Sequence, residues 1–166
     1  LALEEGTNNP RVLRNCHQFT HAAGKAAYEK YEDFPKTVLE CTSVCSHGCY
    51  HAVAEAYFTE KYKNSDGAKK LLKDQSPEAD IIKACSFPVS DVKNNFCTGD
   101  LFHGVGHAFM VLTKNNLNES LKLCNASIPQ RSLLDPKACY FGAFMINSEV
   151  NRSTHPLSPC DTVDEK

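Results

Sequence analysis

Several features that would place this 166-residue chain in a common class of proteins are missing. Its 18 basic and 20 acidic residues nearly balance, and the basic ones are scattered, which argues against a nucleic-acid partner. The longest apolar stretch, Leu101 to Thr113, contains two histidines and is shorter than the roughly 20 residues that cross a bilayer, so we expect no membrane span in this chain. No stretch alternates convincingly between apolar and polar residues, which argues against strands.

The cysteines lack the spacings of common cofactor sites. The chain contains neither the paired Cys-x-x-Cys motifs of structural zinc sites nor the Cys-x-x-Cys-His motif that attaches haem. No signature of a cysteine protease surrounds the adjacent Cys16 and His17. Nine cysteines are more than a reduced domain of this length usually carries, so we expect a secreted, extracellular or cell-surface protein. Three Asn-x-Ser sequons agree with this location and predict glycosylation at Asn118, Asn125 and Asn151.

One sequence pattern recurs three times in the chain. The segments CHQFTHAAGKAAY, CSHGCYHAVAEAYF and CTGDLFHGVGHAFM each contain two histidines four residues apart, and these pairs hold six of the seven histidines. The pairs are His17 with His21, His47 with His51, and His103 with His107. A fourth segment, CYFGAFMINSEV, has Tyr140 and Phe144 in place of the histidines. We interpret the chain as a repeat whose terminal unit is a structural cap.

The spacing of the apolar residues predicts the fold class. Apolar side chains recur at intervals of three and four residues in the repeated segments, and a more polar helical segment ending on a cysteine follows each of the first three. We therefore predict an all-α fold of about seven or eight helices, stacked as consecutive hairpins and clamped by disulfides. Asp66, Pro77 and Asp100 stand where helices are expected to begin. Residues 11–154 form a single helical-repeat domain, between a flexible N-terminal tail (1–10) and a C-terminal tail (155–166).

The same organisation predicts the disulfides, since each polar segment ends on a cysteine and the next repeat opens with one. The predicted pairs are Cys85–Cys97, Cys124–Cys139 and Cys41–Cys45. Only three residues separate the last pair, so Cys41 could instead bond to Cys49 or Cys16. An odd number of cysteines leaves at least one outside these bonds, and a pairing of Cys16 with Cys49 would leave Cys160 over.

Glycines in the histidine segments indicate close helix packing. Gly48, Gly104 and Gly106 each cost about 1 kcal/mol relative to alanine in a helix interior. Close approach of a neighbouring backbone would offset this cost. We therefore predict that the helices cross tightly and bring the six histidines to one interior region, with Tyr140 and Phe144 lining its wall.

Converging imidazoles predict a metal site, because neutral histidine suits copper and zinc better than calcium or magnesium. Three imidazoles on each of two ions would resemble the coupled dicopper centres of hemocyanins and tyrosinases in ligand number and helix spacing. That resemblance implies a copper-dependent oxidoreductase acting on dioxygen or a small substrate. Zinc with an open position would instead activate water. Glu55, one turn after His51, is either a ligand, a general base or a solvated glutamate.

Non-catalytic interpretations also fit the sequence. The histidines could store or deliver copper, bind haem in pairs, or form hydrogen bonds to carbonyl groups and to Tyr28, Tyr50 and Tyr57. The sequons and the odd cysteine fit a glycosylated surface-layer or filament subunit, and hence a homo-oligomer or surface assembly.

The order of the motifs carries a wider resemblance, which spans Cys16 to Asn147. Cys-His-x-x-x-His, Cys-x-His-Gly-x-x-His and His-Gly-x-Gly-His-Ala are followed by Leu-x-Leu-Cys and Cys-x-x-Gly-x-Phe-Met-x-Asn. This series resembles a group of secreted or membrane-anchored bacterial and archaeal proteins. The resemblance implies an extracytoplasmic location and no particular activity.

Overall fold

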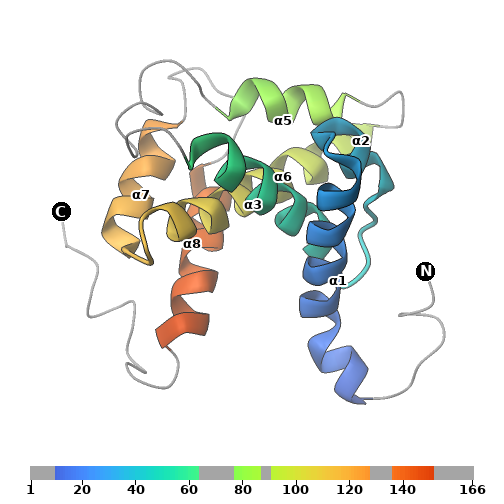
Figure 1. The fold of residues 1–166 in the computed structure, drawn as a ribbon, viewed down its shortest axis with the longest axis horizontal. Helices are drawn as coiled ribbons and strands as arrows, with labels where there is room; N and C mark the ends of the chain where they lie inside the picture. The colour runs from blue at the N-terminus through green and yellow to red at the C-terminus, as the bar shows by residue number, and fades with distance from the viewer. Residues whose placement is uncertain (1–9, 64–76, 87–90, 128–135, 152–166) are drawn as a thin grey trace.

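The computed structural model describes residues 10–63, 77–86, 91–127 and 136–151, and it shows the predicted all-α fold (Figure 1). Within these ranges there is no strand. The seven described helices are α1 (Pro10–Tyr31), α2 (Phe34–Glu40), α3 (Gly48–Tyr62), α5 (Glu78–Cys85), α6 (Asp91–Leu112), α7 (Leu117–Ala126) and α8 (Pro136–Asn151). The predicted tails lie outside the described residues, apart from Pro10 at the start of α1.

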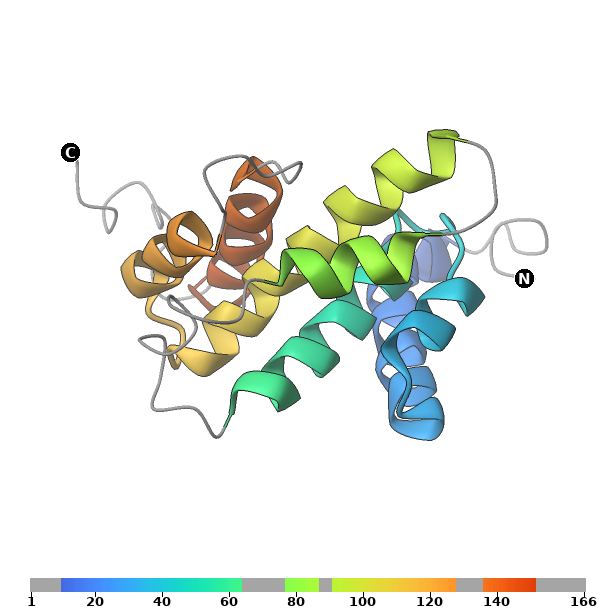
Figure 2. The same cartoon turned by 90° about the horizontal axis from the view of Figure 1, so that it is seen from above.

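The four helices built from the repeated segments form a row in the order α1, α3, α6 and α8. The most extensive contacts in the described part of the chain are those of α3 with α6, of α6 with α8 and of α1 with α3. The outer helices α1 and α8 extend past the central pair on the same side of the molecule (Figure 1). In the view from above, α5 lies across the central pair and α7 lies beside α8 (Figure 2). None of the described helices combines the length and the apolar character needed to cross a bilayer.

Helix boundaries follow local capping chemistry. The carboxylate of Asp33 accepts a hydrogen bond of 3.0 Å from the backbone N–H of Lys36 and so caps α2. The side chain of Asn116 caps α7 in the same way. Pro77 precedes the first residue of α5, as predicted, and Asp66 lies outside the described residues. The expected helix start at Asp100 is wrong, because α6 already begins at Asp91 and Asp100 lies in its interior.

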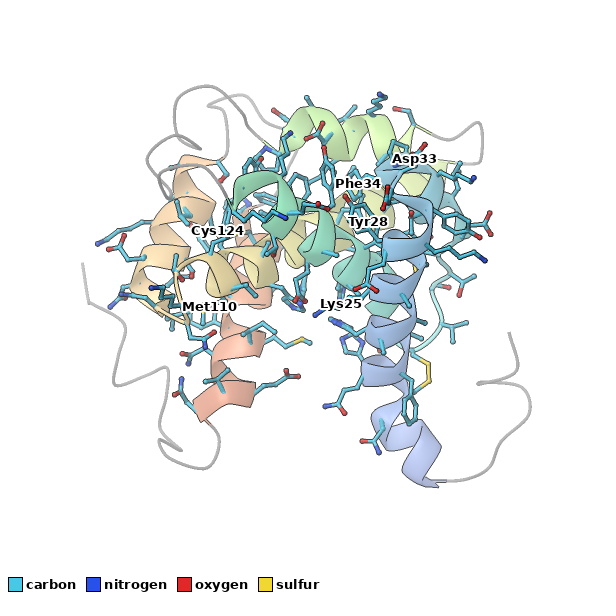
Figure 3. All side chains as sticks on the ribbon, viewed as in Figure 1. Lys25, Tyr28, Asp33, Phe34, Met110 and Cys124 are labelled. Atoms are coloured by element: carbon cyan, nitrogen blue, oxygen red, sulfur yellow. A yellow bond between two sulfur atoms is a disulfide. The ribbon has the colours of Figure 1, made fainter. Side chains whose placement is uncertain are left out.

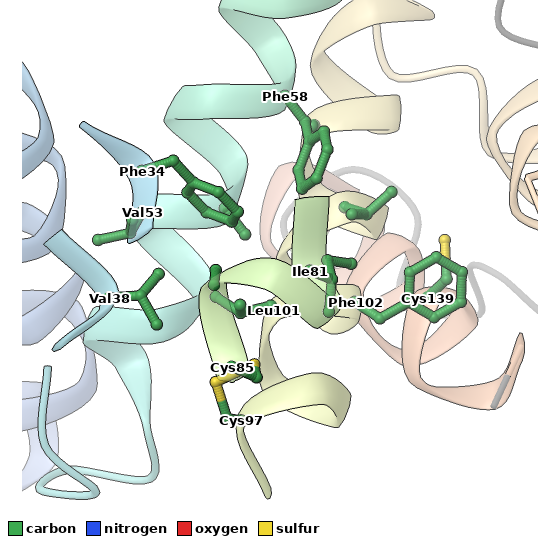
Figure 4. Close-up of a cluster of buried hydrophobic side chains, with 14 of the residues drawn as sticks. Phe34, Val38, Val53, Phe58, Ile81, Cys85, Cys97, Leu101, Phe102 and Cys139 are labelled. Carbon is green, nitrogen blue, oxygen red and sulfur yellow. A yellow bond between two sulfur atoms is a disulfide. The ribbon is translucent and has the colours of Figure 1, made fainter. Parts of the chain in front are cut away.

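The hydrophobic core lies where α2 and α5 pack on the central pair α3 and α6 (Figure 4). Side chains from all four helices are almost fully buried there, and each contributes about 1.5–3 kcal/mol relative to an exposed position. Those seen in Figure 4 include Phe34, Val38, Val53, Phe58, Ile81, Leu101 and Phe102. This core holds α3 and α6 in a fixed relation to each other.

Four disulfides connect the described segments of the chain. The bond Cys85–Cys97 joins α5 to α6, and the bond Cys124–Cys139 joins α7 to α8. Both of these bonds are predicted from the sequence. The predicted Cys41–Cys45 bond is wrong, because Cys41 is bonded to Cys49 and Cys45 to Cys16.

A local turn explains this exchange of partners. Cys45, Ser46 and His47 have left-handed backbone conformations, with φ of 57°, 55° and 62°. This turn reverses the chain before α3. As a result Cys45 reaches Cys16 on α1, and Cys49, in the first turn of α3, lies opposite Cys41. The alternative pairing of Cys16 with Cys49 is therefore also wrong, and Cys160 lies outside the described residues.

Candidate metal centre

Three glycines allow the helices that carry the histidines to cross closely. A Cβ atom at Gly104 would overlap the backbone carbonyl of His51 on α3. One at Gly106 would overlap the carbonyl of Cys139 on α8, and one at Gly142 would overlap that of His103. Residues two apart on a helix point in nearly opposite directions, about 200° apart. The Gly-Val-Gly sequence therefore lets α6 contact α3 on one side and α8 on the other.

Five histidines meet where α1, α3 and α6 cross. The ring centroids of His51 and His103 are 4.1 Å apart, and those of His17 and His21 are 4.6 Å apart. His107 lies 5.2 Å from His21 and 5.9 Å from His51. One interior cluster thus contains both histidines of α1, both of α6 and one of α3. Below we call these five residues the histidine cluster.

His47 is linked to this cluster through Asp100, whose carboxylate also contacts His51. It precedes the first residue of α3 in a left-handed conformation, so it is not on the helical face that carries His51. Its Nδ1 lies 3.0 Å from Oδ2 of Asp100, and its ring contacts that of Tyr50. His47 belongs to neither group of candidate metal ligands found among the described residues, and the helix begins only after it.

Three of the clustered histidines have one ring nitrogen held by an acceptor. Nδ1 of His17 donates a 2.8 Å hydrogen bond to the carbonyl oxygen of Cys45, which leaves Nε2 as the nitrogen with the lone pair. Nδ1 of His107 lies 3.4 Å from Oε2 of Glu55, and Nε2 of His51 lies 3.5 Å from Oδ1 of Asp100. Contacts of this kind orient the histidine ligands of metal ions.

The opposite nitrogens face the interior. His51 Nδ1, His103 Nε2 and His107 Nε2 are buried and have no hydrogen-bond partner among the described residues. An unpaired buried polar atom costs about 1–3 kcal/mol. His107 is completely buried, so rotation toward solvent does not remove this cost. Three such atoms in one cluster indicate a site built for a group that accepts electron pairs.

Distances within the cluster fit the ligands of a metal ion. Nε2 of His17 and Nε2 of His21 are 3.1 Å apart. Two nitrogens bound to one ion at about 2.05 Å lie roughly 2.9–3.4 Å apart for bond angles between 90° and tetrahedral.

Two sets of three residues bring one donor atom each to within 4.8 Å of one another. We call His17, His21 and His51 the nitrogen-only trio, and His21, Glu55 and His107 the carboxylate trio. His21 belongs to both.

Burial favours the neutral form of three clustered imidazoles, those of His21, His51 and His103. Burial, followed by the neighbouring histidines, lowers the pKa of His21 to about 3 and that of His103 to about 2. Burial also lowers the pKa of His51, although the contact with Asp100 opposes it. A neutral imidazole is the form that binds metal, so these three histidines are in their ligating state at neutral pH.

Glu55 is the main buried charge beside the cluster. Burial by itself raises the pKa of this carboxyl group, but hydrogen bonds from His107 and Lys25 outweigh it and lower the pKa to about 2. Oε1 of Glu55 lies 2.7 Å from Nζ of Lys25, which reaches from α1 toward the centre of the molecule (Figure 3). Glu55 is therefore an ionised carboxylate with two partners and not a solvated glutamate.

Sequence reasoning missed two residues that contact the site, Lys25 and Asp100. Each had a signal, because Lys25 follows His21 by four residues and Asp100 precedes His103 by three. Residues so spaced lie on the same face of a helix. Both residues bond across to α3, however, and sequence spacing on one helix does not identify the partner on another.

A pocket of about 180 Å³ lies beside the cluster and is lined by residues of α1, α3 and α8. His17, His21 and Glu55 contribute to its lining, together with Gln18 and Lys25 of α1 and Met145, Ile146 and Glu149 of α8. A small molecule in this pocket would contact the two histidines of α1 directly.

The two α8 side chains predicted to line the histidine region, Tyr140 and Phe144, do not contribute to the lining of this pocket. Met145, Ile146 and Glu149 of α8 line it instead. The hydroxyl of Tyr140 donates a hydrogen bond to Asn125, and Phe144 packs beside Met110, outside the main core. Helix α8 supports the site through its backbone at Gly142. A Cβ atom added at this position would lie 3.2 Å from the ring of His107.

The predicted glycosylation positions all lie on helices. Asn118 and Asn125 are in α7, and Asn151 is the last residue of α8. Asn125 is exposed although its side-chain oxygen accepts the bond from Tyr140. Ser120, the third residue of the first sequon, is buried and bonded to Thr113 and to the carbonyl of Asn116.

The centre thus offers five clustered imidazoles, one ionised carboxylate and an adjoining pocket. Such a donor set suits a borderline metal ion. No family model, curated protein or solved structure matches the chain, so the residues of the centre carry the functional argument by themselves.

Proposed function

We propose that this protein is an extracytoplasmic metalloprotein whose histidine cluster binds copper or zinc. The observation that carries the proposal is the pattern of ring nitrogens: one nitrogen of His17, His51 and His107 is held by an acceptor, while the other faces the cluster. Histidines that serve only packing would satisfy both nitrogens or turn one to solvent. The unpaired interior nitrogens instead match what metal ligands require.

We favour copper as the bound ion, and we place it between the three residues of the nitrogen-only trio. Three imidazoles give a borderline ligand set without carboxylates, and copper(II) binds such a set more tightly than zinc does. Seven pairs of rings in the cluster lie 4.1–5.9 Å apart between centroids, and this close grouping supports a bare ion.

The reaction that this arrangement supports best is oxidation of a small substrate or activation of dioxygen at a copper ion that faces the pocket. His17 and His21 belong to the nitrogen-only trio and also line the pocket, so a small molecule in the pocket would reach the ion. A symmetrical centre with three histidines on each of two ions would require His47, which lies with Asp100. A dinuclear centre would therefore have to use Glu55 on its second ion.

Metal content tests the proposal. Native protein purified without chelators should contain about one copper or zinc ion per chain by elemental mass spectrometry. His51→Ala should lose this metal, whereas His47→Ala, which removes the partner histidine outside the cluster, should retain most of it. Less than half an ion per chain in the native protein, or equal loss in the two variants, would contradict the proposal.

The extracytoplasmic location rests on a separate observation. Four disulfides connect the described segments of the chain, and such bonds persist in oxidising compartments. We extend the proposal to glycosylation at the exposed Asn125, in keeping with the group of secreted or membrane-anchored proteins that the motifs resemble. Mass spectrometry of tryptic peptides from the native source would identify the glycan, and a free amide at all three sequons would remove this part of the proposal.

A further inference from the structure

The salt bridge between Lys25 and Glu55 occupies part of the carboxylate trio. Glu55 supplies the oxygen donor of this trio, and Nζ of Lys25 lies 2.7 Å from Oε1 of the same carboxylate. The ammonium group and a metal ion at this position would both require the charge of Glu55. Each therefore weakens binding of the other.

Lys25 is able to leave this position. Its side chain is 46% exposed, whereas that of Glu55 is 10% exposed. The carboxylate is thus fixed inside the molecule, and the ammonium reaches it from the pocket on a flexible chain. Glu149 of α8 lines the same pocket, so a second carboxylate lies on the side toward which the ammonium would withdraw.

The carboxylate trio also has an independent feature that points to a ligand. His107 is completely buried, and its Nε2 has no partner among the described residues. The two trios share His21, so an ion could exchange the ligands His17 and His51 for Glu55 and His107 without leaving that residue. The position of the ion then depends on whether Glu55 is available.

We propose that the ammonium group of Lys25 is an internal competitor of the metal ion for Glu55, and that it confines the ion to the nitrogen-only trio. This inference rests on the proposed metal-binding function. When the salt bridge separates, the ion gains an oxygen ligand from Glu55. Lys25 therefore determines whether the ion has nitrogen ligands alone or a mixed set, and oxygen ligands favour zinc and copper(II) over copper(I).

A double-mutant cycle tests the competition. Metal-depleted wild-type protein, Lys25→Met, Glu55→Gln and the double variant would be titrated with Zn²⁺ against a coloured chelator. Lys25→Met should bind Zn²⁺ about 10-fold more tightly than wild type, since a charge-assisted hydrogen bond no longer has to be broken. In the Glu55→Gln background the same substitution should have no effect, because the contested carboxylate is absent.

The coordination of copper gives a second measurement. Electron paramagnetic resonance of one equivalent of Cu²⁺ should show nitrogen ligands in the wild type and a mixed nitrogen and oxygen set in Lys25→Met. Lys25→Arg, which keeps the charge, should resemble the wild type. Lys122→Met serves as a control for the loss of a lysine, because Lys122 pairs with Glu119 on the exposed face of α7.

The possible results separate this inference from the proposed function. Equal tightening in the presence and absence of Glu55 would mean that Lys25 acts through its charge alone, and would overturn the inference. Unchanged affinity and an unchanged spectrum in Lys25→Met would overturn it as well. Wild-type protein that binds neither Zn²⁺ nor Cu²⁺ would instead overturn the proposed function itself.

Discussion

Replacing Gly106 by alanine tests how the site is built, because this residue lies at the crossing of α6 and α8. The added Cβ would overlap the carbonyl oxygen of Cys139 and would lie 2.8 Å from the backbone nitrogen of Ala143. Both neighbours are backbone atoms of one helix, so no side-chain rotation relieves the overlap. Helix α8 would have to move away from α6, and Cys139 is also held by its disulfide to Cys124.

The expected magnitude follows from two opposing effects. Overpacking a closely packed contact costs typically about 1–3 kcal/mol, and rigid backbone neighbours favour the upper end of that range. Alanine regains up to about 1 kcal/mol of helix propensity relative to glycine. We therefore expect Gly106→Ala to lower the free energy of unfolding by about 2 kcal/mol.

Gly99→Ala is the matched control on the same helix. No atom lies within 4 Å of the Cβ position at Gly99, so only the propensity gain applies and the free energy of unfolding should rise by up to about 1 kcal/mol. Urea denaturation of both metal-free variants with disulfides intact, followed by circular dichroism, measures the difference. If Gly106→Ala proves as stable as Gly99→Ala, the helices do not cross as closely as this reasoning requires.

Three further predictions concern the core, the pH dependence and the contribution of Asp100. Phe109→Ala should lower the free energy of unfolding by about 3–5 kcal/mol because Phe109 is fully buried, whereas Phe144→Ala, at a partly buried position, should cost only about 1–2 kcal/mol in the same urea titration. Metal-free protein should be fully stable above about pH 7 and lose stability as the pH falls toward 3, because the folded pKa values of His21 and His103, about 3 and 2, lie below the unfolded value of 6.5. Each histidine differs by at most one proton between the two states, so its slope stays below about 1.4 kcal/mol per pH unit. Urea midpoints that do not change between pH 7.5 and 4.5 would contradict this assignment of neutral histidines. Asp100→Asn should weaken Zn²⁺ binding by about 10-fold or more, measured by chelator competition, because Asp100 orients His51; an unchanged affinity would show that this contact does not position the ligand.

The fold was predictable to the extent that it depends on local spacing. Apolar periodicity and the recurring cysteine–histidine segments identified the helices, and the glycines indicated the close crossings that α6 makes with α3 and α8. The disulfide between Cys41 and Cys49 was harder, since it depends on the left-handed conformation of three consecutive residues other than glycine. Such conformations are uncommon for these residue types, and nothing in the local sequence indicates them.

The site was less predictable than the fold, because its partners are distant in the sequence. Helical spacing placed His47 and His51 on one face, but this holds only if the helix includes both, and α3 begins at Gly48. His51 and Asp100 are brought together by the packing of α3 on α6, and His107 and Glu55 by the same contact. The sequence of one helix predicts the face on which a histidine lies. The acceptor that orients this histidine, such as Asp100 or Glu55, comes from the neighbouring helix.

The fourth repeat shows how ligand binding and access are divided between helices. On α8, Tyr140 and Phe144 replace the histidines, and the contact with α6 is made by the backbone at Gly142. Because α8 supplies none of the candidate ligand atoms in the two trios, its side chains in the pocket, Met145 and Glu149 among them, are not constrained by metal geometry. Substitution of Met145 should therefore alter which small molecules reach the ion while leaving its ligands in place.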